Sequence, residues 1–208
     1  MHLSLKMKRN LLSWITVVAM VFMSAAFAGC DKDKDKDNDN GGGGGGGNSS
    51  STMGDYNTSF SYGFYDNDED GDWWLYFANY DMNADLVGLS MTGLPSNLDE
   101  LFIRFSASTD GDIPTGDFSD FYVAFYRTTI ATGKEISFSG GTYYQPDDNI
   151  KLTISKSGDK YTVKYAGVDF YKYDGTLHQN VIAVENSTFS FTGSLAKLIV
   201  QDDDDDDE

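Results

Sequence analysis

The residues with the clearest chemical spacing lie at positions 66–74, where the sequence reads DNDEDGDWW. The first six have the pattern D-x-D-x-D-G, whose alternate carboxylates and glycine match the first half of a calcium-binding loop. The match ends at the twelfth position of the loop, where the expected bidentate glutamate is Phe77. Calcium therefore stays an alternative to a plain acidic hairpin turn. Its candidate ligands are Asp66, Asp68, Asp70 and Asp72.

Catalytic patterns are scarce. His178 is the one histidine after the first 29 residues, and it lies in a turn-like stretch, GTLHQN. The sequence has neither a G-x-S-x-G nor an H-E-x-x-H motif. Two carboxylates could hydrolyse a glycosidic bond, but 33 acidic residues offer no way to choose the pair. We therefore expect no catalytic residue, no enzyme activity and no cofactor besides the calcium alternative, and keep a carboxylate-based glycoside hydrolase as the competing hypothesis.

Aromatic residues indicate a binding role instead. The chain has 13 tyrosines and 14 phenylalanines, more than a core of this size easily holds. The stretches FYKYDG (170–175) and GTYYQPDDN (141–149) set tyrosines beside Asp, Asn and Gln near expected loops. Amphipathic rings with flanking amides and carboxylates suit a sugar ring at a wet surface. We expect a non-catalytic binding or interaction module for a glycan or protein ligand, whose contact residues the sequence does not identify.

The elements that must position these residues read as short strands. Between about residues 55 and 200, aromatic and β-branched residues alternate with polar ones, and Gly, Asp and Asn punctuate the pattern. One short helical turn is the most that MTGLPSNLDEL (91–101) can hold. Expected strands include TSFSYGFY (58–65), DWWLYFANY (72–80), ELFIRFSAS (100–108) and DFYVAFYRTT (120–129).

The best-defined hairpin is IKLTISKSGDKYTVKY (150–165), whose arms join through Ser157, Gly158 and Asp159. The stretches VIAV (181–184) and STFSFTGSL (187–195) are expected to pair with each other as the last two strands. About eight or nine such strands must hide their edges, either in two stacked sheets or by closure. The sequence therefore predicts an all-β fold, an antiparallel β-sandwich over residues 55–200, with a small lipocalin-like β-barrel as the alternative.

The first 29 residues have the layout of a secretory signal. Positive charges lie within residues 1–10, an apolar run covers 11–22, and small residues precede Cys30, the only cysteine. The ending FAGC resembles a bacterial lipobox, with Phe27 in place of the usual Leu. That resemblance implies cleavage before Cys30 and its lipidation, which would anchor the protein in a membrane. A retained membrane helix and an ordinary secreted protein are the alternatives.

Residues 30–54 are predicted to be a disordered tether. The run DKDKDKDNDN, seven glycines and NSSST cannot bury apolar surface. An Asp-rich run directly behind the cysteine also resembles the surface-export signal of Bacteroidota lipoproteins. This resemblance implies outer-membrane attachment with the domain facing the cell exterior, and a periplasm-facing anchor is the alternative. The last residues, 201–208 (QDDDDDDE), are predicted to be a disordered acidic tail.

The charge of the chain excludes one class of partner. It has 15 basic and 33 acidic residues, a formal net charge of -18. Such a chain repels phosphate backbones, so we expect no nucleic-acid partner. It also repels anionic lipid headgroups, so we expect membrane attachment through the lipid anchor and not through the folded surface.

Three motifs of the second half of the chain carry a further resemblance. These are DIPTGDF, the hairpin stretch TISKSGDKYTV and the closing FSFTGSL. They are similar to motifs in uncharacterised lipoprotein domains of gut Bacteroidota, over about residues 101–195. The resemblance implies a β-rich domain on a lipid anchor at the outer membrane or cell surface, and it implies no activity.

Overall fold

The computed structural model describes residues 45–56, 58–68, 71–84, 94–107, 111–147 and 149–199. All of these belong to one compact unit, made of residues 42–84 and 89–208. A second unit, residues 1–41 and 85–88, lies outside the described residues. The predicted signal (1–29), Cys30, the start of the predicted tether and the acidic tail (201–208) also lie outside them.

The described part of the chain is all β, as the sequence predicted, and it contains eleven strands and one short 3-10 helix. This is more than the expected eight or nine strands, and two of the eleven have only two or three residues. The elements are β1 (Gly45–Thr52), η2 (Gly54–Tyr56), β2 (Tyr62–Asn67), β3 (Asp72–Ala78), β4 (Asn97–Ser106), β5 (Gly116–Phe118), β6 (Phe121–Thr129), β7 (Lys134–Gly141), β8 (Leu152–Ser157), β9 (Lys160–Asp174), β10 (Gln179–Gly193) and β11 (Ala196–Lys197).

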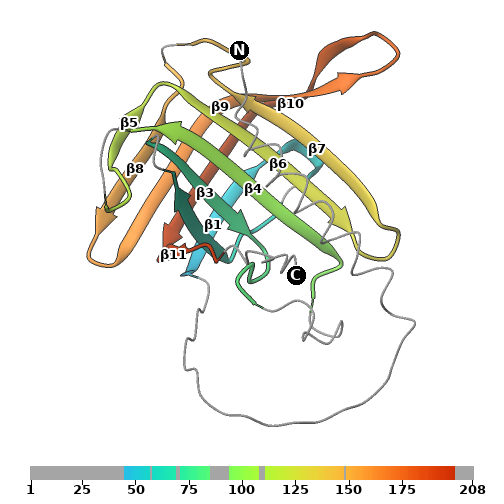
Figure 1. The fold of residues 1–208 in the computed structure, drawn as a ribbon. Coiled ribbons are helices and arrows are strands. Elements are labelled where there is room, and N and C mark those ends of the chain that lie inside the picture. Colours follow the sequence, from blue (N-terminus) through green and yellow to red (C-terminus); the bar gives the residue numbers. More distant parts are fainter. Residues whose placement is uncertain are drawn as a thin grey trace, which may run out of the picture. The chain divides into compact units, whose positions relative to one another are not determined.

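The strands form one sheet that closes on itself. Their order is β10-β1-β2-β3-β4-β6-β7-β9-β8-β5, and β9 also pairs with β10, which completes the circuit. All pairs are antiparallel except β11 with β2. In Figure 1, β4, β6 and β7 cross in front of β9, β10 and β1, so the unit has the two packed layers expected of a sandwich. The layers are parts of one continuous sheet, which is the closed arrangement that the sequence left as the alternative.

Long, bent strands join the two layers. Near its start, β9 pairs with β8 (Val163 with Ile154), whereas further along it pairs with β7 (Phe170 with Gly140). Register shifts in β10 between Ile182 and Thr188 let the hairpin turn this corner. The prediction that VIAV and STFSFTGSL pair with each other is therefore wrong. Both lie in β10, because the intervening residues form a bulge and not a turn.

The interior is a single aromatic-rich core. On β3, β4 and β6, every second side chain points inward, as the alternation predicts. The inward residues of these strands are less than a few per cent exposed, and each large one contributes about 1.5–3 kcal/mol by burial. They are Trp73, Leu75 and Phe77; Leu101, Ile103 and Phe105; and Phe121, Val123 and Phe125.

A buried ion pair lies beside this core. Asp99 is 2% exposed, and Arg127 donates to its two carboxylate oxygens from Nε at 2.6 Å and from Nη2 at 2.8 Å. The guanidinium carbon also lies 5.7 Å from the ring centroids of Tyr56 and Phe125. This bidentate geometry satisfies a carboxylate that would otherwise be costly to bury.

The prediction that the tether extends to residue 54 is wrong, because β1 (Gly45–Thr52) belongs to the sheet. It pairs with β10 from Gly47 with Gly193 to Thr52 with Thr188. A Cβ atom on Gly47 would lie 2.3 Å from Cζ of Phe191, so the close approach requires glycine there. Composition misled the prediction since β1 contributes backbone hydrogen bonds and close packing, not apolar side chains.

The short helical turn allowed for residues 91–101 is also not found where the structure describes them. Residues 94–96 are not helical, and β4 begins at Asn97. Residues 91–93 lie outside the described part of the chain. The one 3-10 turn, η2, instead follows β1, where the chain turns toward β2.

Candidate functional site

The acidic stretch at residues 66–74 includes the end of β2 and the start of β3, which pair as a hairpin, as the turn interpretation predicted. Asn67 pairs with Trp73 on either side of it. The Asp68 N–H donates to the Asp72 carbonyl at 3.1 Å, and the Asp72 N–H donates to Oδ1 of Asp68 at 3.0 Å. Asp70, the third candidate calcium ligand, lies outside the described residues.

The described carboxylates of this loop already contact protein groups. Asp72 forms an ion pair with Arg104 through Oδ2 and accepts a hydrogen bond from Ser106 Oγ at 2.6 Å. Asp66 accepts the N–H of Asn67 at 2.9 Å, and burial raises the pKa of its half-buried carboxyl. Among the described residues, no three His, Cys, Asp or Glu side chains are placed to hold a metal ion.

His178 lies in the turn between β9 and β10. Its Nδ1 is 3.4 Å from the Tyr173 hydroxyl, and both residues are exposed. Asp174 holds the turn, because its Oδ1 accepts the N–H groups of Thr176 and Leu177, and these bonds lower its pKa. The carboxylate of Asp174, which is close to His178 in sequence, therefore accepts hydrogen bonds from backbone N–H groups of the turn.

Five aromatic rings form a continuous row on the outer face of the sheet, which we call the outer aromatic row. Neighbouring ring centroids are separated by 5.3, 6.0, 6.3 and 5.7 Å along the row. The rings come from β3, β4, β6, the turn after β7, and β9. In order, they are Tyr76, Phe102, Tyr122, Tyr144 and Tyr171.

The strand registers explain why these rings meet. Tyr76 pairs with Phe102, and Phe102 pairs with Ala124 in the next strand. The same line across the sheet continues from Ala124 to Ser139 and from Ser139 to Tyr171. The small side chains leave room for the ring of Tyr122, diagonal to Phe102, and for Tyr144. Every ring of the row is partly buried and keeps only a minor part of its surface exposed.

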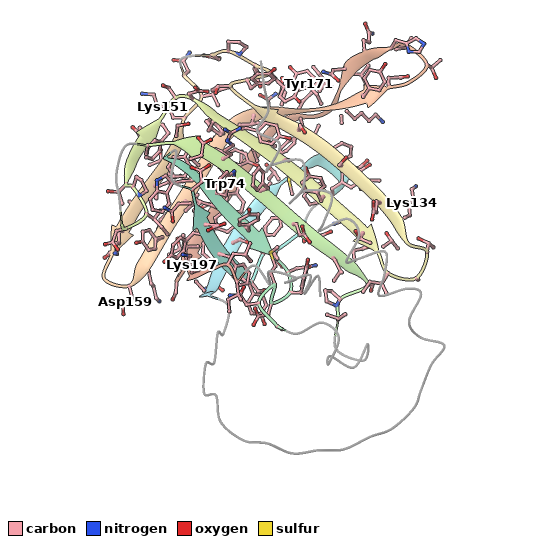
Figure 2. The ribbon with its side chains drawn as sticks, in the orientation of Figure 1. Trp74, Lys134, Lys151, Asp159, Tyr171 and Lys197 are labelled. Carbon is pink, nitrogen blue, oxygen red and sulfur yellow. The ribbon has the colours of Figure 1, made fainter. Side chains whose placement is uncertain are left out.

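The row lies on the solvent side of strands that already have an inner set of apolar residues. Trp73 is fully buried, whereas its neighbour Trp74 is only partly buried on the outer face. Figure 2 labels Trp74 on the sheet and Tyr171 on β9, at the base of a projecting ribbon. The rings of the row are therefore not part of the core cluster inside the sheet.

Polar groups flank the row on both sides. On one flank, Arg104 pairs with Asp72, next to Trp74. On the other flank, the Tyr80 hydroxyl donates to Oε1 of Glu100. Burial is the largest cause of the raised pKa of Glu100, and the hydrogen bond from Tyr80 opposes it.

Hydrogen bonds also fix parts of the row itself. The Tyr122 hydroxyl and Ser139 Oγ are 2.8 Å apart. Beside Tyr144, the side-chain carbonyl of Gln145 accepts the N–H of Asp169 at 2.8 Å, which ties the turn after β7 to β9. The row is therefore built on strands and on a turn held against a strand, which suits a surface that must keep its shape.

The sequence identified two of the five rings of this surface. The aromatic stretches at 141–149 and 170–175 contain Tyr144 and Tyr171, which the structure brings to 5.7 Å with their rings stacked. Tyr76, Phe102 and Tyr122 were not singled out, because alternation alone does not say which of two aromatic faces is the inner one. Aromatic residues at adjacent positions of a strand, such as Trp73 and Trp74, indicate that one of the two rings lies on the outer face.

The expectations on membrane attachment rest on residues outside the described part of the chain, including Cys30. Within the described residues, no helix is long and apolar enough to cross a membrane. Comparison with known proteins adds no relative from which to transfer a role to the outer aromatic row. No protein family, curated protein or solved structure matches this chain.

Proposed function

We propose that the chain is a non-catalytic binding module whose outer aromatic row binds a glycan. The observation that carries the proposal is the row itself, five contacting rings on the solvent side of a sheet with a complete inner core. A continuous row of partly exposed aromatic rings on a rigid sheet is typical of binding sites. Tyrosine supplies an apolar ring face together with a hydroxyl, which suits sugar rings and their hydroxyl groups.

The flanking groups support the same ligand class. Arg104, Asp72 and Glu100 place charged hydrogen-bonding groups along both sides of the apolar strip. A few polar groups around an apolar surface are the usual way in which a site orients its ligand. A glycan presents apolar ring faces and hydroxyl edges at once, so it can use both parts of this surface.

A hydrolase fits the surface less well. Among the described residues, the outer-face carboxyls with a raised pKa are Asp66 and Glu100. Asp66 lies in the register row of Trp74, while Glu100 lies two strands from β2 in the row of Ala78. Strand geometry puts their Cα atoms about 16 Å apart. Glycosidases hold their two carboxyl groups about 5–9.5 Å apart. Side chains on one face of a sheet project outward and not toward each other, so the wide Cα separation of this pair favours binding over hydrolysis.

The proposed cellular setting is that of a lipoprotein. The lipobox-like FAGC sequence supports Cys30 as the lipid-bearing residue, and the Asp-rich run behind it supports attachment to the outer membrane with the domain facing outward, as in Bacteroidota. A glycan-binding surface on such a domain would meet carbohydrate outside the cell. The membrane partner of this protein is then the lipid anchor, and its ligand is the glycan.

The test measures binding and cleavage together. The full chain in detergent is mixed with insoluble neutral polysaccharides; retention is measured by pull-down, and bond cleavage by release of reducing ends. We expect retention without cleavage. Tyr122→Ala and Tyr171→Ala should each weaken retention about tenfold or more, because a lost stacking contact of about 1.4 kcal/mol is a factor of ten.

The matched control is Tyr62→Ala, which removes a half-exposed tyrosine of β2 outside the row. It should bind like the wild type, and melting curves for all three variants should confirm that they fold. Trp74 beside the row gives a second readout, since its emission should change on binding and the change should disappear in Trp74→Phe. Cleavage of the polysaccharide, or equal binding by all variants, would overturn the proposal.

A further inference from the structure

The β9–β10 hairpin continues beyond the sheet as a two-stranded ribbon. The last described pair between β7 and β9 joins Ser139 and Tyr171. Beyond it, the pairs from Lys172 with Val181 to Asp174 with Gln179 lie within the hairpin. Figure 1 shows this ribbon projecting from the body of the sheet.

One face of the ribbon continues the outer aromatic row. Tyr171, the last ring of the row, and Tyr173 lie two residues apart on β9 and therefore on the same face. Ile182 pairs with Tyr171, and Asn180 pairs with Tyr173, so these side chains share that face. Tyr173 is 64% exposed and Ile182 is 46% exposed.

A second exposed ring lies at the same end of the row. Tyr143 is 64% exposed, and its ring is 5.2 Å from that of Tyr144 in an edge-to-face contact. The row thus ends on three side chains that are far more exposed than the rings over the sheet. They are Tyr143, Tyr173 and Ile182.

We infer that the ligand is an extended, neutral, linear glycan that lies across the strands from Tyr76 to the ribbon. This inference rests on the proposed function and adds to it the length of the ligand. Four strand-to-strand steps separate β3 from β9, and two further residues lead to Tyr173. Measured along this path, at about 4.8 Å per step and about 3.4 Å per residue, the strip is about 25 Å long. The path bends at β9, where its last two residues run along the strand, and it has room for about four or five sugar units.

Charge and width favour this occupant. With a net charge of -18, the protein repels uronic-acid or sulfated polymers, so a neutral chain is the better match. The strip is narrow, because ion-paired Arg104 borders it on one side and Glu100 on the other. A protein partner needs about 800 Å² of surface on each side, whereas a linear glycan needs only a strip of rings.

The experiment measures affinity against chain length. The full chain in detergent is titrated, by calorimetry and Trp74 emission, with linear β-1,4-linked gluco-, manno- and xylo-oligosaccharides from disaccharides to hexasaccharides. For the type that binds, affinity should rise about tenfold or more from the disaccharide to the pentasaccharide and then level off. Tyr173→Ala should weaken pentasaccharide binding about fivefold and leave disaccharide binding unchanged.

The control is Leu177→Ala, which removes an equally exposed apolar side chain, 58% exposed, from the turn of the same ribbon. It should leave all affinities unchanged. Equal affinity for disaccharide and hexasaccharide, no effect of Tyr173→Ala, or stronger retention on heparin than on neutral glycans would overturn the inference while the binding function stands. No binding to any polysaccharide or oligosaccharide would overturn the binding function as well.

Discussion

Asp99 and Glu100 are neighbours in sequence with opposite surroundings. Asp99 is buried and accepts two charge-assisted hydrogen bonds from Arg127. Glu100 lies on the outer face, where partial burial raises its pKa and the negative charges of Asp99 and Glu135 raise it further. Tyr80 stabilises the ionised form of Glu100, because its hydroxyl donates a hydrogen bond to the carboxylate. Two adjacent residues of one strand therefore differ: the carboxylate of Asp99 is held in an ion pair, whereas that of Glu100 is costly to ionise.

Glu100 should therefore make folding stability depend on pH. A carboxyl whose pKa is higher in the folded than in the unfolded state binds more protons when folded, so stability falls as pH rises through that window. Glu100→Gln cannot ionise and keeps an acceptor for Tyr80. We expect the melting temperature of Glu100→Gln, relative to that of the wild type, to increase as pH rises from about 4 to about 7. At about pH 7 it should be higher than that of the wild type.

Thermal melts over a pH series check this expectation. Glu185→Gln, which changes an exposed carboxylate on β10, should follow the wild type more closely. A difference between Glu100→Gln and the wild type that is constant with pH would show that ionisation of Glu100 does not affect the folded state.

At the scale of elements, β1 shows that a glycine run can be a strand. It closes the sheet between β10 and β2 with a backbone ladder and without large side chains. Its register places Gly47 against Gly193, where the ring of Phe191 fills the space that a side chain would need. The strand therefore stabilises the fold by hydrogen bonding and close approach, a contribution that hydrophobicity does not report.

Two adjacent glycines provide a matched test of this role. A Cβ atom on Gly47 would lie 2.3 Å from Phe191 Cζ, whereas one on Gly46 would have nothing within 4 Å. Gly47→Ala should lower the free energy of unfolding by about 1–3 kcal/mol, the usual cost of overpacking, and Gly46→Ala should cost less than about 1 kcal/mol. Denaturant unfolding of both variants measures the difference. If both were neutral, residues 45–47 would behave as a linker and not as a strand.

At the scale of the whole molecule, the start of β1 at Gly45 shortens the segment available between Cys30 and the folded unit to residues 30–44. The unit presents its outer aromatic row across β3, β4, β6, β7 and β9 of a closed sheet, and its acidity favours solubility over adhesion to anionic surfaces. In the proposed setting, the lipid on Cys30 holds the protein at a membrane while the sheet binds ligand.

Cys30→Ser should release the protein from the membrane fraction into the soluble fraction, because the sulfur that carries the lipid is lost. Fractionation of cells, with the wild type in parallel, measures the change. A variant that stays in the membrane fraction would favour the retained membrane helix formed by the apolar run at residues 11–22. Such a result would leave the binding proposal untouched, because the row is far from these residues in sequence.

The local part of the fold could be predicted and the distant part could not. The hairpins β2–β3 and β8–β9 follow from period-two alternation and from turn residues such as Gly158, which lie close together in sequence. The pairing of Ser51 with Phe189 joins residues far apart, and no local signal indicates it. The bulge in β10 likewise resembles a turn in the local sequence, because only the pairing with β9 shows that the strand continues through it.

The sequence by itself determined the β class, the acidity, the leader-like first residues and the absence of familiar catalytic motifs, since these depend on composition and short-range pattern. The tertiary structure alone decided which aromatic residues face outward and meet. Alternation assigns side chains to two faces, and only closure of the sheet decides which face becomes the core. Tyr76 and Tyr171 belong to one surface because strand pairing brings β3, β4, β6, β7 and β9 side by side.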